Sequence, residues 1–504
     1  MNQLLWVPET THKKTFTPII VAILACIVFA AAATPRCCFA DITLPKFFSD
    51  HMVLQQNTNF PVWGMAEPNQ ALVVRFNDSE VKARANVNGR FSVSIKTPSA
   101  GGPYRLEIAD EEKSTGVILD DVMVGEVWLC AGQSNMSWPV EKSADASAEV
   151  LSANNYNRIR LFTVEVQAAD EPMEDVAKAK PWSICSADNI KDFSAVGYFF
   201  GRDLAKTLKE TPIGLIDASL GGTSCEAWCS MESLSEVAEL EPLLKYWSEI
   251  EGPNDHHRPG TLFNGIISPL VRYPLRGVIW YQGEANVGRG KQYATLLPTL
   301  ISDWRRQFGD DQLPFYLAQL APYRYSNFPT EALPEIWDAQ LKTAQTVANV
   351  AMATTMDLGS TSDLHPKNKQ SVGKRLAMLA LSDTYQSALD MESVNGPLYD
   401  SMSISDDVIR LEFRNVGAGL KNLSKCDPIG AFLVCGEDQV FHPASVKEIG
   451  EDWVAIVSPE VQSPKAVRYC WDDTAASLLG NSDGLPAFPF RTDDYRLSSE
   501  DAQY

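Results

Sequence analysis

The sequence predicts an α/β protein whose central domain is a three-layer α/β/α core with a parallel sheet, flanked by N-terminal and C-terminal β-sandwich-like domains. From residue 119 to 392, apolar strand-like runs alternate with helical patterns, which is typical of a parallel sheet covered on both faces. On either side, the chain shows short apolar alternations broken by turn residues. In such a core, ligands bind beyond the carboxyl ends of the strands.

The first forty residues have the pattern of a targeting segment. Lys13 and Lys14 precede an apolar run over 19–33, and Cys38-Phe39-Ala40 ends in a small-x-Ala pattern. The run is short for a membrane span but fits a secretory signal peptide cleaved after Ala33 or Ala40. A retained anchor and lipoprotein-type processing at Cys26 are the alternatives. We therefore predict an exported protein, periplasmic, extracellular or lumenal, with no stable membrane insertion after cleavage.

Composition and charge narrow the possible partners. The 504 residues are 45% hydrophobic and carry a formal charge of -21, which becomes -23 when residues 1–40, with three cations and one anion, are removed. Such an acidic chain without a basic run repels nucleic acid, so we exclude nucleic acid as a partner.

The cysteine count does not define a disulfide framework. Seven of the ten cysteines lie beyond residue 40, an odd number that leaves at least one thiol unpaired, and their pairing stays open. Cys130, within an apolar strand, is the best candidate for a simple core residue. Cys225 and Cys229 have neither a second pair nor a nearby histidine, so we predict no metal site.

The N-terminal β domain is expected at 41–118. Its clearest signal is a hairpin in which Asn88-Gly89 separates the alternating residues at 85–87 and 91–95.

The central domain, 119–392, contains five expected strands separated by helical patterns. One such helical pattern places Val196, Phe200, Leu204 and Leu208 at i+4 spacing. The strands are expected at 122–130, 213–220, 277–281, 315–320 and 350–356.

The C-terminal β domain, 393–504, shows alternation at 409–413 and an apolar run at 453–457. Its Pro-rich segment 484–491 is expected to lie extended on a neighbouring surface.

A candidate nucleophile lies where the first central strand ends. The strand leads into Ala-Gly-Gln-Ser-Asn, whose small residues allow a tight turn and place Ser134 at the mouth of the next element. There a developing oxyanion would meet free backbone N–H groups. The alternative is that Ser134 is an ordinary helix N-cap.

A candidate base and its orienting carboxylate follow the last central strand. In Ser362-Asp363-Leu364-His365-Pro366, a carboxylate two residues before an imidazole can reach Nδ1–H and turn Nε2 toward a nucleophile. None of the other histidines lies in so suitable a setting, so we interpret Asp363 and His365 as a unit. The alternative is a surface loop.

Two further strand ends offer donors for an oxyanion hole. Gly221-Gly222 follows the strand at 213–220, and glycine lets a backbone N–H approach a substrate closely. Gln282 and Asn286 lie in Gln-Gly-Glu-Ala-Asn after the strand at 277–281. Glu284, in the same segment, is interpreted as a buried carboxylate that holds loops together.

These blocks in this order, Gly-Gln-Ser-Asn, Gly-Gly-Thr, Gln-Gly-Glu and Asp-x-His, resemble the SGNH (GDSL-like) hydrolases, specifically the sialate O-acetylesterase family. Further similar segments lie at 44–55, 262–267 and 484–493, so the resemblance covers nearly the whole chain beyond residue 40.

The resemblance implies a set of roles for these residues. It implies Ser134 as nucleophile, His365 as base and Asp363 as acid. The oxyanion hole would comprise the N–H of Ser134, a glycine of the pair, for which we choose Gly222, and a side chain, Gln282, with Asn286 as the alternative.

The activity so implied is release of acetate from O-acetylated sugars through an acyl-enzyme, without a metal or organic cofactor. The substrate is an O-acetylated carbohydrate, most directly O-acetylated sialic acid. An acetylxylan or other neutral-polysaccharide acetylesterase is the alternative, and a secreted carbohydrate-binding protein without activity is a further one. A site for the sialic acid carboxylate calls for an arginine near Ser134, and Arg289 and Arg324 are the candidates, with solvated loop charges as the competing interpretation.

Overall fold

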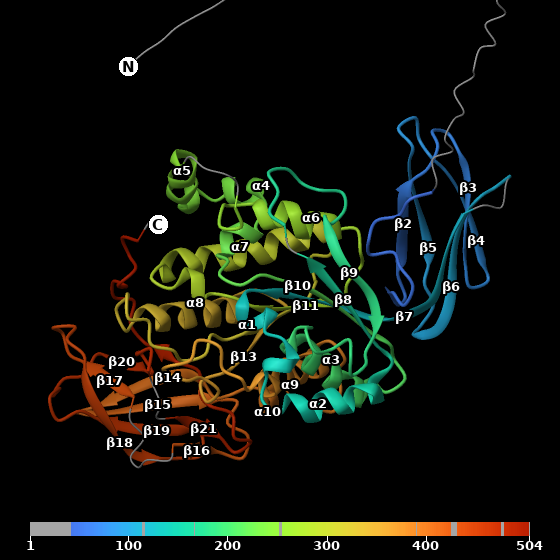
Figure 1. Ribbon diagram of the computed structural model, residues 1–504. Helices are drawn as coiled ribbons and strands as arrows, with labels where there is room; N and C mark the ends of the chain where they lie inside the picture. The colour runs from blue at the N-terminus through green and yellow to red at the C-terminus, as the bar shows by residue number, and fades with distance from the viewer. Residues whose placement is uncertain are drawn as a thin grey trace, which may run out of the picture. The chain divides into compact units, whose positions relative to one another are not determined.

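A single long strand, β7 (Gly116–Gly132), belongs to both the N-terminal β region and the central sheet of the computed structural model (Figure 1). Its first half pairs with β1 (Val53–Gln55) and β6 (Gly101–Asp110). Its second half pairs with β10 (Ile213–Ser219) and β11 (Gly277–Tyr281). The domain boundary expected at 118/119 therefore falls inside a strand. The structure describes residues 42–112, 116–165, 167–250, 255–389, 391–424, 431–474 and 478–502. The signal peptide expected at 1–40 lies outside these residues.

The central sheet has the strand order β13-β12-β11-β7-β10-β8-β9. All neighbouring pairs are parallel except β8 with the edge strand β9. The five expected strands are present, and β8 and β9 are additional. The strands other than β7 are β8 (Ile159–Glu165), β9 (Lys178–Ile184), β10 (Ile213–Ser219), β11 (Gly277–Tyr281), β12 (Phe315–Ala318) and β13 (Val350–Ala353).

Helices cover both faces of this sheet, because large apolar side chains project from each face. On one face Trp128 of β7 packs on Phe200 of α3, with ring centroids 5.0 Å apart, and α3 packs against α9. On the other face Trp280 of β11 packs on Trp304 of α7, at 5.6 Å, and α7 packs against α8. The helices are α1 (Ser134–Ser137), α2 (Ala146–Ser152), α3 (Ala195–Leu208), α4 (Met231–Ser235), α5 (Glu241–Glu249), α6 (Ser268–Leu270), α7 (Gly290–Phe308), α8 (Ala332–Thr346), α9 (Lys369–Asp383) and α10 (Met391–Val394).

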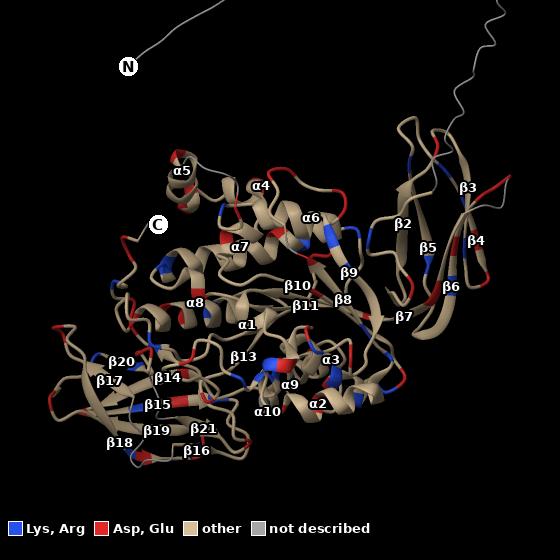
Figure 2. Cartoon of the chain, in the orientation of Figure 1, with Lys and Arg blue, Asp and Glu red and all other residues tan. Residues whose placement is uncertain are grey.

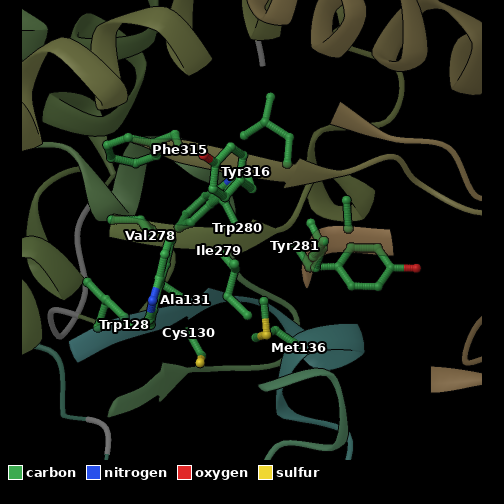
Figure 3. Packing of buried hydrophobic residues seen from close by; sticks show 14 of the residues in the cluster. Trp128, Cys130, Ala131, Met136, Val278, Ile279, Trp280, Tyr281, Phe315 and Tyr316 are labelled. Carbon is green, nitrogen blue, oxygen red and sulfur yellow. The ribbon is translucent and has the colours of Figure 1, made fainter. Parts of the chain in front are cut away.

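The side chains between these layers form the core under the strand ends (Figure 3). Cys130 is fully buried there, and a Cβ added to Gly197 of α3 would lie 2.9 Å from its sulfur, so the helix packs directly on the strand. The prediction that Cys130 is a core residue is confirmed. The six cysteines in the described part of the chain are all buried.

The expected hairpin around Asn88-Gly89 is wrong in its pairing. The turn exists, with Gly89 at φ +79°, but the strands that flank it pair elsewhere: β5 with β2 and β4 with β3. The turn therefore connects two sheets, because Val93 of β5 pairs with Val62 of β2. The strands of this region are β1 (Val53–Gln55), β2 (Asn59–Met65), β3 (Ala71–Phe76), β4 (Ser79–Arg84), β5 (Arg90–Lys96) and β6 (Gly101–Asp110).

The C-terminal region is a separate antiparallel sheet of order β14-β15-β19-β18-β17-β20-β22, with a two-stranded ribbon of β16 and β21. The expected alternation at 409–413 lies in β15 and the run at 453–457 is β19. The strands are β14 (Leu398–Ser405), β15 (Val408–Arg414), β16 (Leu420–Asn422), β17 (Phe432–Cys435), β18 (His442–Ile449), β19 (Trp453–Val457), β20 (Ala466–Tyr469), β21 (Leu479–Asn481) and β22 (Phe490–Arg491).

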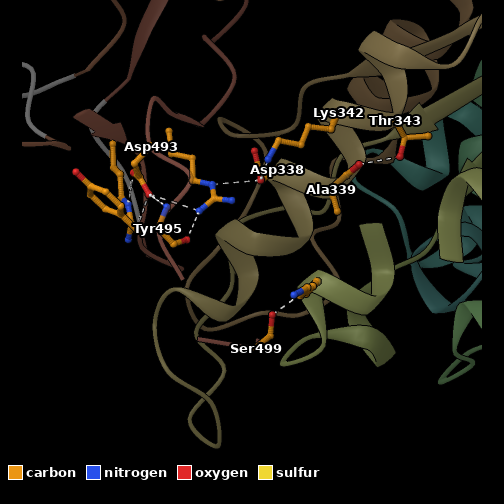
Figure 4. Close-up of polar contacts among 10 residues, drawn as sticks. Asp338, Ala339, Lys342, Thr343, Asp493, Tyr495 and Ser499 are labelled. Carbon is orange, nitrogen blue, oxygen red and sulfur yellow. Dashed lines mark hydrogen bonds and ion pairs between the residues drawn. The ribbon is translucent and has the colours of Figure 1, made fainter. Parts of the chain in front are cut away.

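The end of the chain returns to the helices of the central region (Figure 4). Arg491 forms ion pairs with Asp338 of α8 and with Asp493, both at 3.5 Å. The amide N–H of Lys291 in α7 donates to the hydroxyl of Ser499 at 3.0 Å. These contacts join the last strand of the C-terminal sheet and the segment after it to α8 and α7.

In Figure 2 the positions of Lys and Arg are interspersed with those of Asp and Glu along the described ribbon. None of the helices in the described ranges is long and apolar enough to span a membrane.

Candidate active site

Ser134 begins α1 directly after the end of β7. Gly132 has φ +138°, and Gln133 is extended and occupies the position before the helix. The carbonyl of Gln133 accepts the N–H groups of Met136 and Ser137, at 2.8 and 3.0 Å. Ser134 is thus the first residue of the helix rather than its N-cap, and its hydroxyl is free for another partner.

That partner is His365, in the loop between β13 and α9. The distance between Ser134 Oγ and His365 Nε2 is 2.8 Å, although the two residues lie 231 positions apart. The indole of Trp138 stacks on the imidazole, with ring centroids 4.9 Å apart and planes 17° from parallel. Stacking on the Trp138 indole and the hydrogen bond at Nε2 together fix the orientation of the imidazole.

The first residues of α3 hold the short helix α1, which begins with Ser134. The Ser194 hydroxyl accepts the N–H of Gly197 at 3.0 Å and so caps α3. The same hydroxyl donates to the carbonyl of Met136 at 2.6 Å. A buried helix cap therefore holds the short helix that carries Ser134.

The electrostatic surroundings favour an uncharged imidazole. Burial lowers the pKa of His365, the positive charge of Lys369 lowers it further, and the charge of Asp363 raises it. The base is therefore neutral at a lower pH than an ordinary histidine.

Asp363 contacts His365 through the main chain. Its Oδ1 accepts the amide N–H of His365 at 3.0 Å, and its side chain is exposed. Among the described residues, no hydrogen bond joins the Asp363 carboxylate to the imidazole ring. The carboxylate thus shapes the loop and acts on the ring through its charge.

The glycine pair after β10 approaches the serine, as its position in the sequence predicts. A Cβ added to Gly221 would lie 3.2 Å from Ser134 Cβ, so a larger residue there would press on the serine turn. Gly222 is exposed, has φ +78°, and has open space where a Cβ would be. The main chain of this pair is therefore beside the hydroxyl and accessible.

Gln282 and Asn286 are fully buried, and their amide groups are engaged inside the protein. Gln282 Nε2 donates to the carbonyl of Thr223 at 3.1 Å and to Asn286 Oδ1 at 2.7 Å. Asn286 Nδ2 donates to Glu226 Oε2 at 3.0 Å. In this structure, the two side chains join loops instead of presenting an amide N–H to a substrate.

Arg289 is a buried residue, so the interpretation as a solvated loop charge is wrong for it. Its Nη1 lies 2.9 Å from Oε1 of Glu226, which is fully buried, and 2.7 Å from Gln292 Oε1. Its guanidinium compensates an internal carboxylate, which makes it a poor candidate for holding the carboxylate of a substrate.

Arg324 is exposed and lies beside the loop of the base. Its amide N–H donates to the carbonyl of Thr361 at 3.3 Å, two residues before Asp363. Of the two arginines proposed from the sequence, this one is exposed, and its main chain contacts the loop that carries His365.

Sequence reasoning missed Trp138, Asn135 and Lys369. Each has a signal that could have found it: Asn135 directly follows Ser134, Trp138 is one helical turn further, and Lys369 lies four residues after His365. Lys369 is the single buried lysine in the described ranges, at 1% exposure, and its Nζ donates to Asn135 Oδ1.

Comparison with known proteins agrees with this fold. A family model described as "Carbohydrate esterase, sialic acid-specific acetylesterase" matches residues 124–382. The human sialate O-acetylesterase is 29% identical over 88% of this chain and 91% of its own length, and the mouse sialate O-acetylesterase is 30% identical over 68% and 73%. The crystal structure of a carbohydrate acetylesterase from Xanthomonas citri superposes with a TM-score of 0.82, at 33% identity, over 90% of this chain and all of that one.

Fold and comparisons together define a carboxylic ester hydrolase. The chain belongs to the sialic acid-specific acetylesterase family of carbohydrate esterases, whose members act on O-acetylated carbohydrates.

Proposed function

We propose that this protein is an O-acetylesterase of SGNH type, in which Ser134 is the nucleophile and His365 is the general base. The observation that carries the proposal is the 2.8 Å contact between Ser134 Oγ and His365 Nε2, formed at the carboxyl ends of parallel strands. A nucleophile and base within hydrogen-bond reach, with the base held by other groups, is the arrangement that serine acyl transfer requires.

The reaction would proceed in two steps. His365 Nε2 accepts the proton of Ser134 as Oγ bonds to the acetyl carbon, and the imidazolium then gives this proton to the sugar oxygen as the ester bond breaks. Water attacks the acetyl-enzyme, giving its proton to His365, and acetate leaves as the proton returns to Ser134 Oγ.

The negative charge on the acetyl oxygen needs donors at the transition state. The main-chain N–H of Ser134 and that of a glycine of the pair, Gly222 in our assignment, are the candidates. The close approach of Gly221 to Ser134 supports this assignment. Gln282 has both amide hydrogens engaged, so its contribution would need a rearrangement of the loop.

Covalent labelling tests the nucleophile. A fluorophosphonate should modify Ser134, with one adduct per chain located by peptide mass spectrometry, because only an activated serine attacks phosphorus quickly. Labelling carried out at a pH at which His365 is protonated should be slower. Absence of labelling at Ser134 would favour the alternative of a carbohydrate-binding protein without activity.

The substrate is proposed from the relatives and from the arginines. The curated relatives are sialate O-acetylesterases, which favours O-acetylated sialic acid, and Arg324 would bind its carboxylate. A neutral acetylated polysaccharide such as xylan is the alternative. The formal charge of -21 favours the neutral substrate, because it repels an anionic one.

Acetate release from 9-O-acetylated sialic acid and from acetylated xylan oligomers should be measured side by side. If the protein is a sialate esterase, Arg324→Ala should raise KM for the sialic acid about 10-fold to 100-fold, because a charge-assisted hydrogen bond is lost. The hydrolysis of 4-nitrophenyl acetate, which has no carboxylate, should be unaffected. Arg306→Ala, which removes an exposed arginine in the last turn of α7, is the matched control. Faster release from xylan, with no effect of Arg324→Ala, would contradict the sialate assignment.

We also infer export, from the lysines and apolar run in residues 1–40. N-terminal sequencing of the secreted protein should begin at Thr34 or Asp41. Recovery of the intact N-terminus in the cytosolic fraction would contradict this.

A further inference from the structure

A group of three polar residues, two of them buried and the third half-buried, lies next to Ser134 and His365 and takes no part in the proton transfers above. It consists of Lys369 at the start of α9, Asn135 after the nucleophile, and Glu284 after β11. Lys369 and Asn135 are 1% and 2% exposed. A buried lysine is costly unless its charge is compensated, so its presence beside the site calls for a reason.

Asn135 connects three segments of the site. Its Nδ2 donates to Glu284 Oε1 at 2.5 Å and to the carbonyl of Leu364 at 3.1 Å. Its Oδ1 accepts from Lys369 Nζ. Since Leu364 directly precedes His365, the residue after the nucleophile holds the residue before the base.

The charges of Lys369 and Glu284 depend on each other. Glu284 Oε2 is enclosed and has no hydrogen-bond partner in the described part of the chain. Burial raises the pKa of Glu284, and the Asn135 hydrogen bond and the charge of Lys369 lower it. Removal of either charge alone would leave the other buried without its counter-charge.

Aromatic rings enclose the ammonium group on the side of the base. Lys369 Nζ lies 5.9 Å from the centre of the Trp138 ring and 5.6 Å from that of Tyr281. Trp138 is the ring that stacks on His365. The positive charge is thus held close to the imidazole, in surroundings that screen it weakly.

We propose that Lys369 is a positioning residue for ester hydrolysis: through Asn135 and Glu284 it locks the nucleophile turn to the loop of His365, and its charge keeps the imidazole in the uncharged form that accepts a proton. The inference rests on the proposed function, because it assigns Lys369 a role toward the base. The inference also assigns a role to the Glu284 carboxylate, which is the counter-charge that offsets the cost of burying Lys369.

The charged groups around His365 determine the sign of the effect. Lys369 faces the imidazole from α9 and Asp363 from its own loop, Lys142 lies 5.9 Å from the Trp138 ring, and Glu284 faces Lys369 across Asn135. Burial lowers the pKa of Lys369 to about 7, and that of His365 lies below its ordinary value near 6.5. Lys369 is therefore mostly charged while His365 titrates, and its removal raises the pKa of His365.

The pH profile of kcat/KM for 4-nitrophenyl acetate tests the proposal. The wild-type activity should rise with pH through a midpoint below about 6.5. In the double variant Lys369→Met/Glu284→Gln, which leaves no unpaired buried charge, this midpoint should move up by about 0.5 to 1 pH unit. Its kcat should fall about 10-fold to 100-fold with little change in KM, because the geometry of the pair is loosened.

Lys367→Met is the matched control, since Lys367 is exposed in the same loop. It should leave both midpoint and kcat unchanged. A purely structural role would lower the melting temperature of the double variant and leave the midpoint at the wild-type value, which would overturn the inference. A wild-type protein that fluorophosphonate does not label would overturn the proposed function itself, so the two failures are distinguishable.

Discussion

Replacement of Ser134 with alanine is expected to lower kcat for 4-nitrophenyl acetate by on the order of 10⁴-fold or more. The change removes the atom that bonds to the acetyl carbon and leaves His365 without its 2.8 Å partner. Because the Ser134 hydroxyl caps no helix, stability should change little, within about 0.5 kcal/mol.

Ser137→Ala is the matched control for this prediction. Ser137 lies on the same short helix, and its hydroxyl donates only to the carbonyl of Ser134, at 3.3 Å. The control should keep most of its activity. If Ser134→Ala kept more than about a tenth of the wild-type kcat, with Ser137→Ala indistinguishable from it, another residue would have to be the nucleophile.

The residues that follow strand ends could be predicted because a parallel sheet brings its strand ends together. Ser134 follows β7, Gly221 follows β10, and His365 follows β13 by twelve residues, so sequence position already placed them at one edge. This topology alone brings Ser134 and His365 to the same edge of the sheet, and side-chain contacts then fix their geometry. The two residues could thus be paired without knowledge of the side-chain packing.

The burial of Gln282, Asn286 and Arg289 could not be predicted in the same way. All three are held by a network centred on Glu226, which lies about sixty positions earlier in the chain. Nothing local marks Glu226 as buried, and a polar loop sequence looks the same whether its amides face a substrate or a carboxylate. The contacts with Glu226 and its neighbours therefore decide whether Gln282, Asn286 and Arg289 face a substrate or the interior.

The continuity of β7 and the pairing of β5 could not be predicted for a related reason. β7 is a continuous strand through 118/119, because its apolar residues are buried first against the N-terminal strands and then within the central sheet. Alternation predicts that β5 is a strand, but its partner depends on which sheet buries Val93 and Phe91. The wrong pairing concerns contacts between distant segments, while the strands themselves were recognisable.

Gly132→Ala is expected to lower kcat/KM about 100-fold without touching any group that takes part in the chemistry. Gly132 has φ +138°, which an alanine rarely adopts, and its added Cβ would lie 2.2 Å from the carbonyl oxygen of Tyr281. That same oxygen accepts the N–H of Gln133 at 2.9 Å. To relieve the clash, the ends of β7 and β11 must separate, which moves Gln133 and with it Ser134.

The measurement is the steady-state rate on 4-nitrophenyl acetate together with the melting temperature, because the clash should also cost about 1–3 kcal/mol of stability. Gly309→Ala is the control, since Gly309 also has a positive φ, +68°, but its Cβ would meet nothing within 4 Å. It should lose about 1 kcal/mol of stability and no activity. If the Gly132 variant were folded and fully active, the serine turn would tolerate displacement, and the activity could not depend on the hydrogen-bonded geometry of Ser134 and His365.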